Sequence, residues 1–130
     1  MSFSPQYSAP TPRDVSGADA EDLALYREKF RRRLPQSLDE LHGSAHGVVA
    51  LPLHLAWSGM SSYDLDKPRW RMGLYRTVLH EGLHDDLPRY LNQDLLIPLW
   101  PVLRTLVGRS VRAVWEDAFP QLASRTRAAT

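Results

Sequence analysis

The sequence predicts a mainly α-helical fold: a small domain of four to five helices, with one short β-strand or extended apolar segment near residues 48–57 and a flexible N-terminal arm. Apolar residues recur at three- and four-residue steps through most of the chain, which is the period of an amphipathic helix. Only the segment GVVALPLHLAW alternates with the two-residue period of a strand. A chain of 130 residues buries one core rather than two. We therefore expect a single helical domain over residues 19–123, between the arm at 1–18 and a disordered tail at 124–130.

The composition restricts the class of function. The net charge is only +1, whereas nucleic-acid-binding domains usually carry a clustered basic excess. Because the chain has no cysteine, disulfides, thiolate zinc sites and cysteine nucleophiles are excluded. The arm has no signal-peptide pattern, and the longest apolar runs are about half as long as a membrane span requires. We expect a cytoplasmic protein that is not in a membrane and for which nucleic acid is an unlikely partner.

The first helix is expected to begin near Asp19, a candidate N-cap, and to end before Pro35. Its last turn contains three consecutive arginines, Arg31, Arg32 and Arg33. Guanidinium groups are suited to binding phosphate or carboxylate groups. Cations in a last turn are also what the helix dipole favours, and we prefer this structural explanation.

A capping box, Ser37 with Glu40, predicts a short second helix that Gly43 can end. The strand follows it, with large apolar side chains on alternate residues: Val49, Leu51, Leu53, Leu55 and Trp57. Because Pro52 has no N–H, one edge of this strand should be unpaired. No second strand of comparable quality is evident. The segment therefore forms a short hairpin, lies across helices, or pairs with another chain.

Three further helices are expected after residue 64. The first covers residues 67–81, with Asp66 as its candidate N-cap. The second begins at Asp86 and is broken by two prolines around Trp100. The third covers residues 101–119, where apolar side chains form one continuous row.

Residues 80–84 read HEGLH, which matches the H-E-x-x-H signature of zinc hydrolases. In such enzymes both histidines bind zinc from one unbroken helix, and the glutamate activates the bound water. The candidate metal ligands are therefore His80 and His84, and Glu81 is the candidate catalytic base. A third ligand would have to come from Asp94, Glu116, His54, or the pair His42 and His46.

The residues around this motif favour a different explanation. Gly82 is a poor helix residue and a common helix terminator. Asp85 and Asp86, followed by a proline, are typical of the start of the next helix. Arg76 lies one turn before His80, where its charge would disfavour a metal dication. We therefore expect a helix end here and no cofactor, with zinc as the alternative.

Four segments carry a resemblance to a known group: YREKFRRRLPQSLDELHG, LPLHLAWSG, RMGLYRTVL and LNQDLLIPLWPVLRTLVGRSVRAVWEDAFP. Together they resemble small actinobacterial proteins associated with AbiEii-type nucleotidyltransferase toxins, over about Glu21 to Leu122. The resemblance implies an antitoxin or an accessory subunit whose partner is such a toxin. The resemblance rests on the overall similarity of these segments rather than on a catalytic motif, so it implies no site residues.

The sequence thus predicts a non-enzymatic, partner-binding protein of the antitoxin or accessory-subunit type. A homodimer is a possible state of this protein. The expected partner-binding residues are the apolar strand and the tryptophan near the proline break: Leu51, Leu53, Leu55, Trp57 and Trp100. One alternative is a minimal zinc hydrolase that uses HEGLH. A second alternative is a helical module that binds nucleic acid through Arg31, Arg32, Arg33, Arg69 and Arg76.

Overall fold

The structure is a computed structural model that describes residues 24–56 and 60–129; the predicted arm at 1–18 and Trp57 lie outside the described residues. The fold is mainly helical, as predicted. In chain order the elements are a helix over residues 24–33, η2 (Leu38–Glu40), β1 (Val48–Ala50), α2 (Leu53–Ala56), β2 (Ser62–Asp64), α3 (Pro68–Glu81), α4 (Asp86–Tyr90), α5 (Gln93–Leu106), α6 (Arg109–Ala118) and α7 (Pro120–Ala129).

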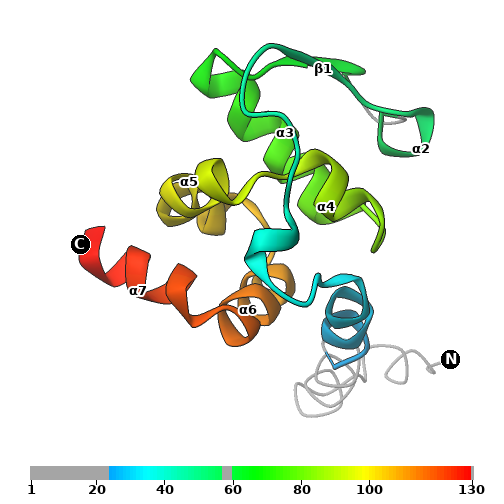
Figure 1. Ribbon diagram of the computed structural model, residues 1–130. Coiled ribbons are helices and arrows are strands. Elements are labelled where there is room, and N and C mark those ends of the chain that lie inside the picture. The colour runs from blue at the N-terminus through cyan, green and yellow to red at the C-terminus, as the bar shows by residue number, and fades with distance from the viewer. Residues whose placement is uncertain (1–23, 57–59, 130) are drawn as a thin grey trace, which may run out of the picture.

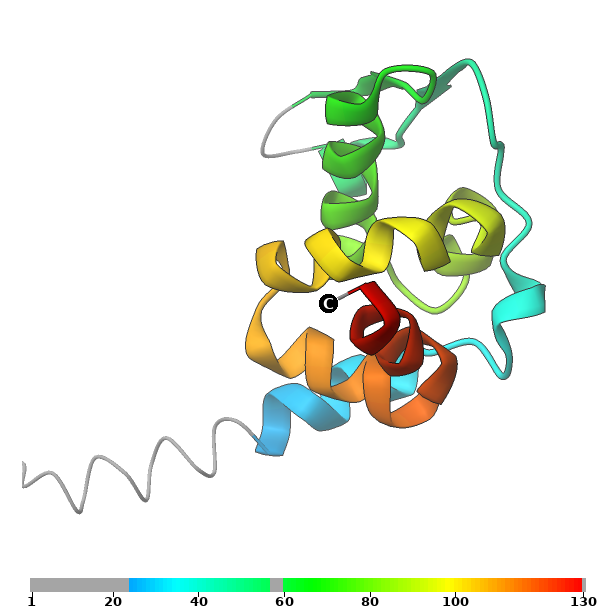
Figure 2. The same cartoon turned by 90° about the vertical axis from the view of Figure 1, so that its left-hand side faces the viewer.

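Helix α3 is the centre of the fold, and α2, β2, α4 and α5 all pack against it (Figure 1). Helix α5 crosses α3, and α7 packs against both α5 and α6 (Figure 2). The hairpin of β1 and β2 lies at one end of the molecule. The helix over residues 24–33 lies at the opposite end in both views.

The predicted strand is present but much shorter than expected. β1 ends at Ala50 and pairs antiparallel with β2, so that Val49 lies opposite Tyr63. The segment 53–56 instead forms the single helical turn α2, whose first hydrogen bonds are accepted by the Pro52 carbonyl. Proline cannot donate within a strand ladder, but it fits the first turn of a helix. The strand is therefore paired within the chain, in a hairpin, which is one of the three arrangements considered.

The expected second helix is only one 3₁₀ turn, because Ser37 makes no side-chain bond to its backbone. Gly43 was predicted to end this helix, but it has a different role. A Cβ at Gly43 would lie 2.5 Å from the carbonyl carbon of Tyr90. The Gly43 N–H donates to the Leu91 carbonyl at 2.8 Å. Glycine is required here because the chain passes directly over the end of α4.

Helix α3 begins one residue later than predicted. Lys67, in an extended conformation, occupies the N-cap position, and Pro68 is in the first turn. The carboxylate of the preceding Asp64 accepts the Asp66 N–H at 3.0 Å, so Asp66 belongs to the turn before the helix. Four side chains bury the core-facing side of α3: Leu74, Tyr75, Val78 and Leu79.

The helix predicted from Asp86 divides at Asn92 into α4 and α5. The Asn92 side chain accepts the Asp94 N–H at 2.8 Å and so caps α5. The Asn92 N–H donates at 2.8 Å to the hydroxyl of Tyr75 on α3. Burial raises the pKa of Tyr75 to about 12, so this hydroxyl remains protonated. A tertiary contact therefore fixes where α5 begins.

The predicted break at the two prolines is wrong, because α5 continues through both Pro98 and Pro101. The prolines remove helical hydrogen bonds, but the opposite face of α5 is fully buried through Leu96, Trp100 and Leu103. The break occurs instead around Gly108, in an extended conformation before α6. The single helix predicted over residues 101–119 is consequently divided between α5 and α6.

Two contacts hold α6 and α7 on this core. Trp100 Nε1 and Arg104 Nε donate to the same oxygen of Glu116, at 2.8 and 2.7 Å. Beyond α6, the buried Leu122 belongs to α7, which packs against α5. We predicted a disordered tail at residues 124–130. The structure corrects this, because residues 124–129 continue α7.

Candidate functional site

The HEGLH segment coincides with a helix end. Helix α3 ends at Glu81, and Gly82 leaves it with φ −68° and ψ 143° while its N–H still donates to the Val78 carbonyl at 2.8 Å. A Cβ at Gly82 would lie 2.5 Å from that carbonyl oxygen and 3.3 Å from Leu87 Cδ2. Gly82 therefore ends the helix as predicted, although close packing rather than a left-handed backbone requires it.

The residues after Gly82 form the turn into α4, as we predicted from Asp85 and Asp86. Asp86 is the first residue of α4, and its carboxylate accepts the Leu83 N–H at 2.9 Å. The same carboxylate oxygen lies 2.8 Å from Nε2 of His54 on α2. His84 lies in the exposed turn between the helices. His80 and His84 are thus not on one unbroken helix, which is the geometry that the zinc signature requires.

The candidate third ligands are also separated or engaged elsewhere. Glu116 binds Trp100 and Arg104, and His54 binds Asp86. His46 lies 3.5 Å from Asp66, near the hairpin. Asp94 is in the exposed first turn of α5, and His42 forms an isolated bridge with Asn92. Within the described part of the chain, no three such side chains are grouped so that they could hold a metal ion.

His80 contacts side chains of the first helix rather than other candidate metal ligands. Arg33 Nη1 donates to the His80 carbonyl at 3.3 Å, and the Phe30 ring meets the imidazole edge-on at 6.3 Å between centroids. Partial burial lowers the pKa of His80; nearby Glu81 raises it, and Arg76 and Lys29 lower it further. His80 is therefore neutral at pH 7.

A groove of about 680 Å³ runs along the outer side of α3, between this helix and the hairpin with α2. Four positions of α3 follow one helical face along it: Arg69, Gly73, Arg76 and His80. Gly73 contributes no side chain, and the Tyr63 ring packs over it: a Cβ there would lie 3.3 Å from Tyr63 Cε2. The aromatic and apolar lining consists of Leu55, Met60, Tyr63 and Trp70. We call this the first groove.

A second groove of about 510 Å³ adjoins the first. Both are lined by His80 and Glu81, which form the boundary between them. The rest of the second groove comes from the first helix and from the start of α6: Tyr26, Lys29, Phe30, Arg33, Arg109 and Ser110. Helix α6 has no acidic residue in its first turn, so the positive end of its dipole adds to this basic surface.

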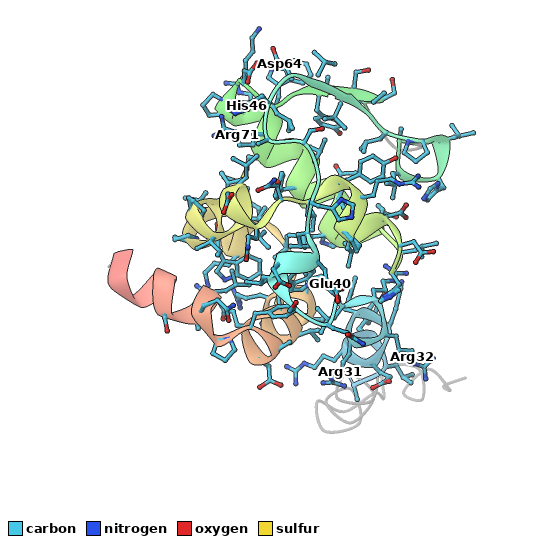
Figure 3. The ribbon with its side chains drawn as sticks, viewed as in Figure 1. Arg31, Arg32, Glu40, His46, Asp64 and Arg71 are labelled. Atoms are coloured by element: carbon cyan, nitrogen blue, oxygen red, sulfur yellow. The ribbon has the colours of Figure 1, made fainter. Side chains whose placement is uncertain are left out.

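The structure divides the arginines of the nucleic-acid alternative into two groups. Arg31 and Arg32 both bind Glu28, at 3.0 and 3.2 Å, and lie at the end of the molecule opposite Asp64 (Figure 3). Arg33, Arg69 and Arg76 line the two grooves. The structural explanation for the triplet, a last helical turn, agrees with residues 24–33 being helical.

The predicted partner-binding residues are not brought together on one surface. Leu51 is 6% exposed, and Leu55 and Trp100 are fully buried, so these three side chains belong to the core. Leu53 is 81% exposed and does not line the first groove, and Trp57 lies outside the described residues. The prediction assumed that a continuous strand exposes one face. The turn at Pro52 rotates alternate leucines inward instead.

Sequence reasoning missed Lys29, Arg109 and Tyr63 as groove residues. The spacing of Arg69, Gly73, Arg76 and His80, which falls on one helical face, was a usable signal for half of the site. The other half comes from the packing of two distant helices, which no local pattern reveals. Comparison with known proteins adds no further guide, since no family model, curated protein or solved structure matches the chain.

One broader expectation concerns membranes. Among the described residues, no helix has both the length and the apolar composition needed to cross a bilayer.

Proposed function

We propose that this protein is a non-enzymatic, partner-binding protein, of the antitoxin or accessory-subunit type, and that it contacts its partner at the first groove. The observation that supports the proposal is the lining of that groove. Trp, Tyr, Met and Arg are the residue types most enriched at protein interfaces, and here they occur together: Met60, Tyr63, Arg69, Trp70 and Arg76.

The exposed apolar side chains near the groove support the same role. Leu53 and Met60, on either side of the segment 57–59, are 81% and 45% exposed. A partner that covers the groove and also extends over α2 would remove both from water, at about 25 cal/mol for each Å² of apolar surface. The contact surface thus moves from the predicted strand to the groove that borders it. Among the predicted partner-binding residues that the structure describes, only Leu55 lines this groove.

Affinity purification from the source organism tests this function. A tagged full-length chain should recover one protein in stoichiometric amount, and the pair should elute together in size-exclusion chromatography. Leu53→Ser with Met60→Ser should weaken the complex, whereas the matched change of exposed Val102 on α5 to Ser should not. A chain that stays alone in the native extract overturns the proposal.

A second candidate is nucleic-acid binding, and one observation favours it: Arg33, Arg69 and Arg76 lie along adjoining grooves. Such binding would weaken steeply with ionic strength because counterions are released from the nucleic acid. A labelled single-stranded oligonucleotide titrated at 50 and 200 mM salt tests it. Affinity that is absent, or independent of salt, removes this candidate.

A further inference from the structure

The first groove is open along α3, and the segment best suited to cover it belongs to the same chain. We propose that the proline-rich part of the N-terminal arm, residues 5–12, docks in the first groove of its own molecule and must leave it when a partner binds there. Docking of the arm is a property of the unbound chain, and only the competition with a partner rests on the proposed function.

The lining of the first groove suits proline rings. The Tyr63 and Trp70 rings meet at 75° with their centroids 6.3 Å apart, and Leu55 and Met60 add further apolar surface. Trp70 is half-buried and Met60 is 45% exposed, so this surface faces solvent. Grooves lined by aromatic side chains bind proline-rich segments in the polyproline II conformation. The groove therefore selects for a proline-rich occupant.

The arm contains such a segment. Residues 5–12 read PQYSAPTP, with three prolines in eight residues. Each proline restricts its own φ, and Ala9 and Thr11, which precede prolines, are biased toward extended conformations as well. A sequence that favours polyproline II before it binds loses little conformational entropy on docking.

The arm is also long enough to reach the groove. Arg33, at the end of the first helix, donates to the His80 carbonyl at 3.3 Å, so this helix end lies beside the end of α3. The path along the helix from residue 24 to Arg33 is about 14 Å, and the groove from His80 to Arg69 adds about 17 Å. Residues 13–23, which join the proline-rich segment to the helix, span up to about 34 Å.

The reach holds if the first helix begins at Asp19, as the sequence predicts. The path to His80 is then about 21 Å along the helix axis. Residues 13–18 span about 20 Å when extended, and the path along the helix is the upper limit of the distance that they must cover. The proline-rich segment adds about 25 Å in polyproline II, which exceeds the length of the groove.

The charges along this path are complementary. Residues 14–23 contain four acidic residues and no basic one: Asp14, Asp19, Glu21 and Asp22. The second groove, which lies between the first helix and the first groove, is lined by three cations and one carboxylate: Lys29, Arg33, Arg109 and Glu81. Opposite charge favours the encounter of two surfaces and fixes their register. The acidic stretch therefore directs the proline-rich segment toward the first groove.

Attachment to the same chain favours the arm over other occupants. A segment on a short tether is present at an effective concentration on the order of 1 mM. A docking contact with a dissociation constant below about 1 mM is therefore populated in the unbound chain. A second copy of the chain reaches that concentration only in millimolar solutions, so the arm of the same molecule outcompetes it.

Two-dimensional ¹⁵N–¹H NMR spectra of the full chain test this contact. The test variant combines Pro5→Ser, Pro10→Ser and Pro12→Ser. If the arm docks, the Gly73 and Thr77 amides and the Trp70 indole N–H shift in this variant, because they lie in the first groove. The matched control, Val15→Ser with Ala18→Ser, changes two apolar residues of the arm outside the proline-rich segment. Its shifts at these signals should be at most about one third as large.

Trp70→Leu gives the reciprocal measurement. It should shift the Ala9 and Thr11 amides, whereas Val102→Ser, on an exposed part of α5 outside both grooves, should not. The proposal is overturned if the three-proline variant leaves the groove signals in place or if the control shifts them equally. Shifts that grow between about 50 and 500 µM protein would place the arm on a second copy, because docking within one molecule is independent of concentration.

The docked arm also affects the partner of the proposed function. Because the arm competes for the first groove, the three-proline variant should bind that partner about two- to tenfold more tightly than the unaltered chain. A partner that binds both chains equally, while the NMR shifts follow the expected pattern, uses a surface other than the first groove, and the docked arm stands. If no partner is recovered, the proposed function fails, and the NMR pattern still decides whether the arm docks.

Discussion

Nε2 of His54 lies 2.8 Å from the carboxylate of Asp86, and this contact ties α2 to the turn that interrupts the H-E-x-x-H segment. The same carboxylate oxygen accepts the Leu83 N–H, so one side chain both shapes the turn and anchors the wall of the first groove. Leu55, on α2, lines that groove. The arrangement that removes the zinc geometry therefore also builds the candidate binding surface.

Asp86→Asn tests this contact. The carboxylate is only 12% exposed and accepts two hydrogen bonds, so its loss should lower the free energy of unfolding by about 1–3 kcal/mol. Urea denaturation followed by circular dichroism measures it. The neighbouring exposed Asp85→Asn should change stability by less than about 0.5 kcal/mol. Equal effects at the two positions would contradict the structural role of Asp86.

Gly82→Ser should destabilise the fold, because a Cβ there meets the Val78 carbonyl oxygen at 2.5 Å. Overpacking of this kind costs about 1–3 kcal/mol. The matched control is Gly108→Ser, where a Cβ meets nothing within 4 Å and where the residue is the N-cap of α6. Since Ser is a better N-cap than Gly, the control should be neutral or slightly stabilising. Thermal unfolding of the two variants gives the comparison.

Metal analysis of the purified chain tests the zinc alternative directly. Because α3 ends at Glu81, His80 and His84 do not share a helical face. We expect well below one zinc per chain after dialysis against zinc, and the same content in His80→Ala. Near-equimolar zinc that disappears in the variant would show that the segment rearranges around the metal, and it would restore the hydrolase as the leading function.

Glu116→Gln should lower stability at pH 7 and flatten its dependence on acid pH. Partial burial alone would raise the pKa of Glu116, but the bonds from Arg104 and Trp100 outweigh it and hold the pKa below its ordinary value. A lowered pKa in the folded state stabilises the fold above the unfolded pKa, and this contribution is lost as pH falls through the folded pKa.

The expected loss for Glu116→Gln at pH 7 is about 1–3 kcal/mol, since the bonded carboxylate is 19% exposed. Glu28→Gln is the control, because its two arginine contacts are exposed and contribute about 0–1 kcal/mol. Urea titrations between pH 3 and pH 7 distinguish them. A Glu116 variant with the same pH profile as the unaltered chain would contradict the assignment.

Local signals in the sequence determined the helical class and several boundaries. The spacing of apolar residues predicted the apolar face of α3. The glycine followed by two aspartates predicted the helix end at Gly82. Both signals act over a few neighbouring residues. The explanation of Arg31 and Arg32 as a last helical turn was of the same kind. Such features depend on the chain within one or two helical turns, so a sequence can specify them.

Only the tertiary structure decided the features that depend on packing between distant segments. Burial of Trp100 and its neighbours keeps α5 continuous through two prolines, although local propensity predicts a break. The short β2, which lacks a strand pattern, pairs with β1 because α3 supports it. The two adjoining grooves likewise combine cations more than 30 positions apart, Arg33 and Arg69, because the first helix packs beside the end of α3. Long-range burial outweighs local preference at each of these places.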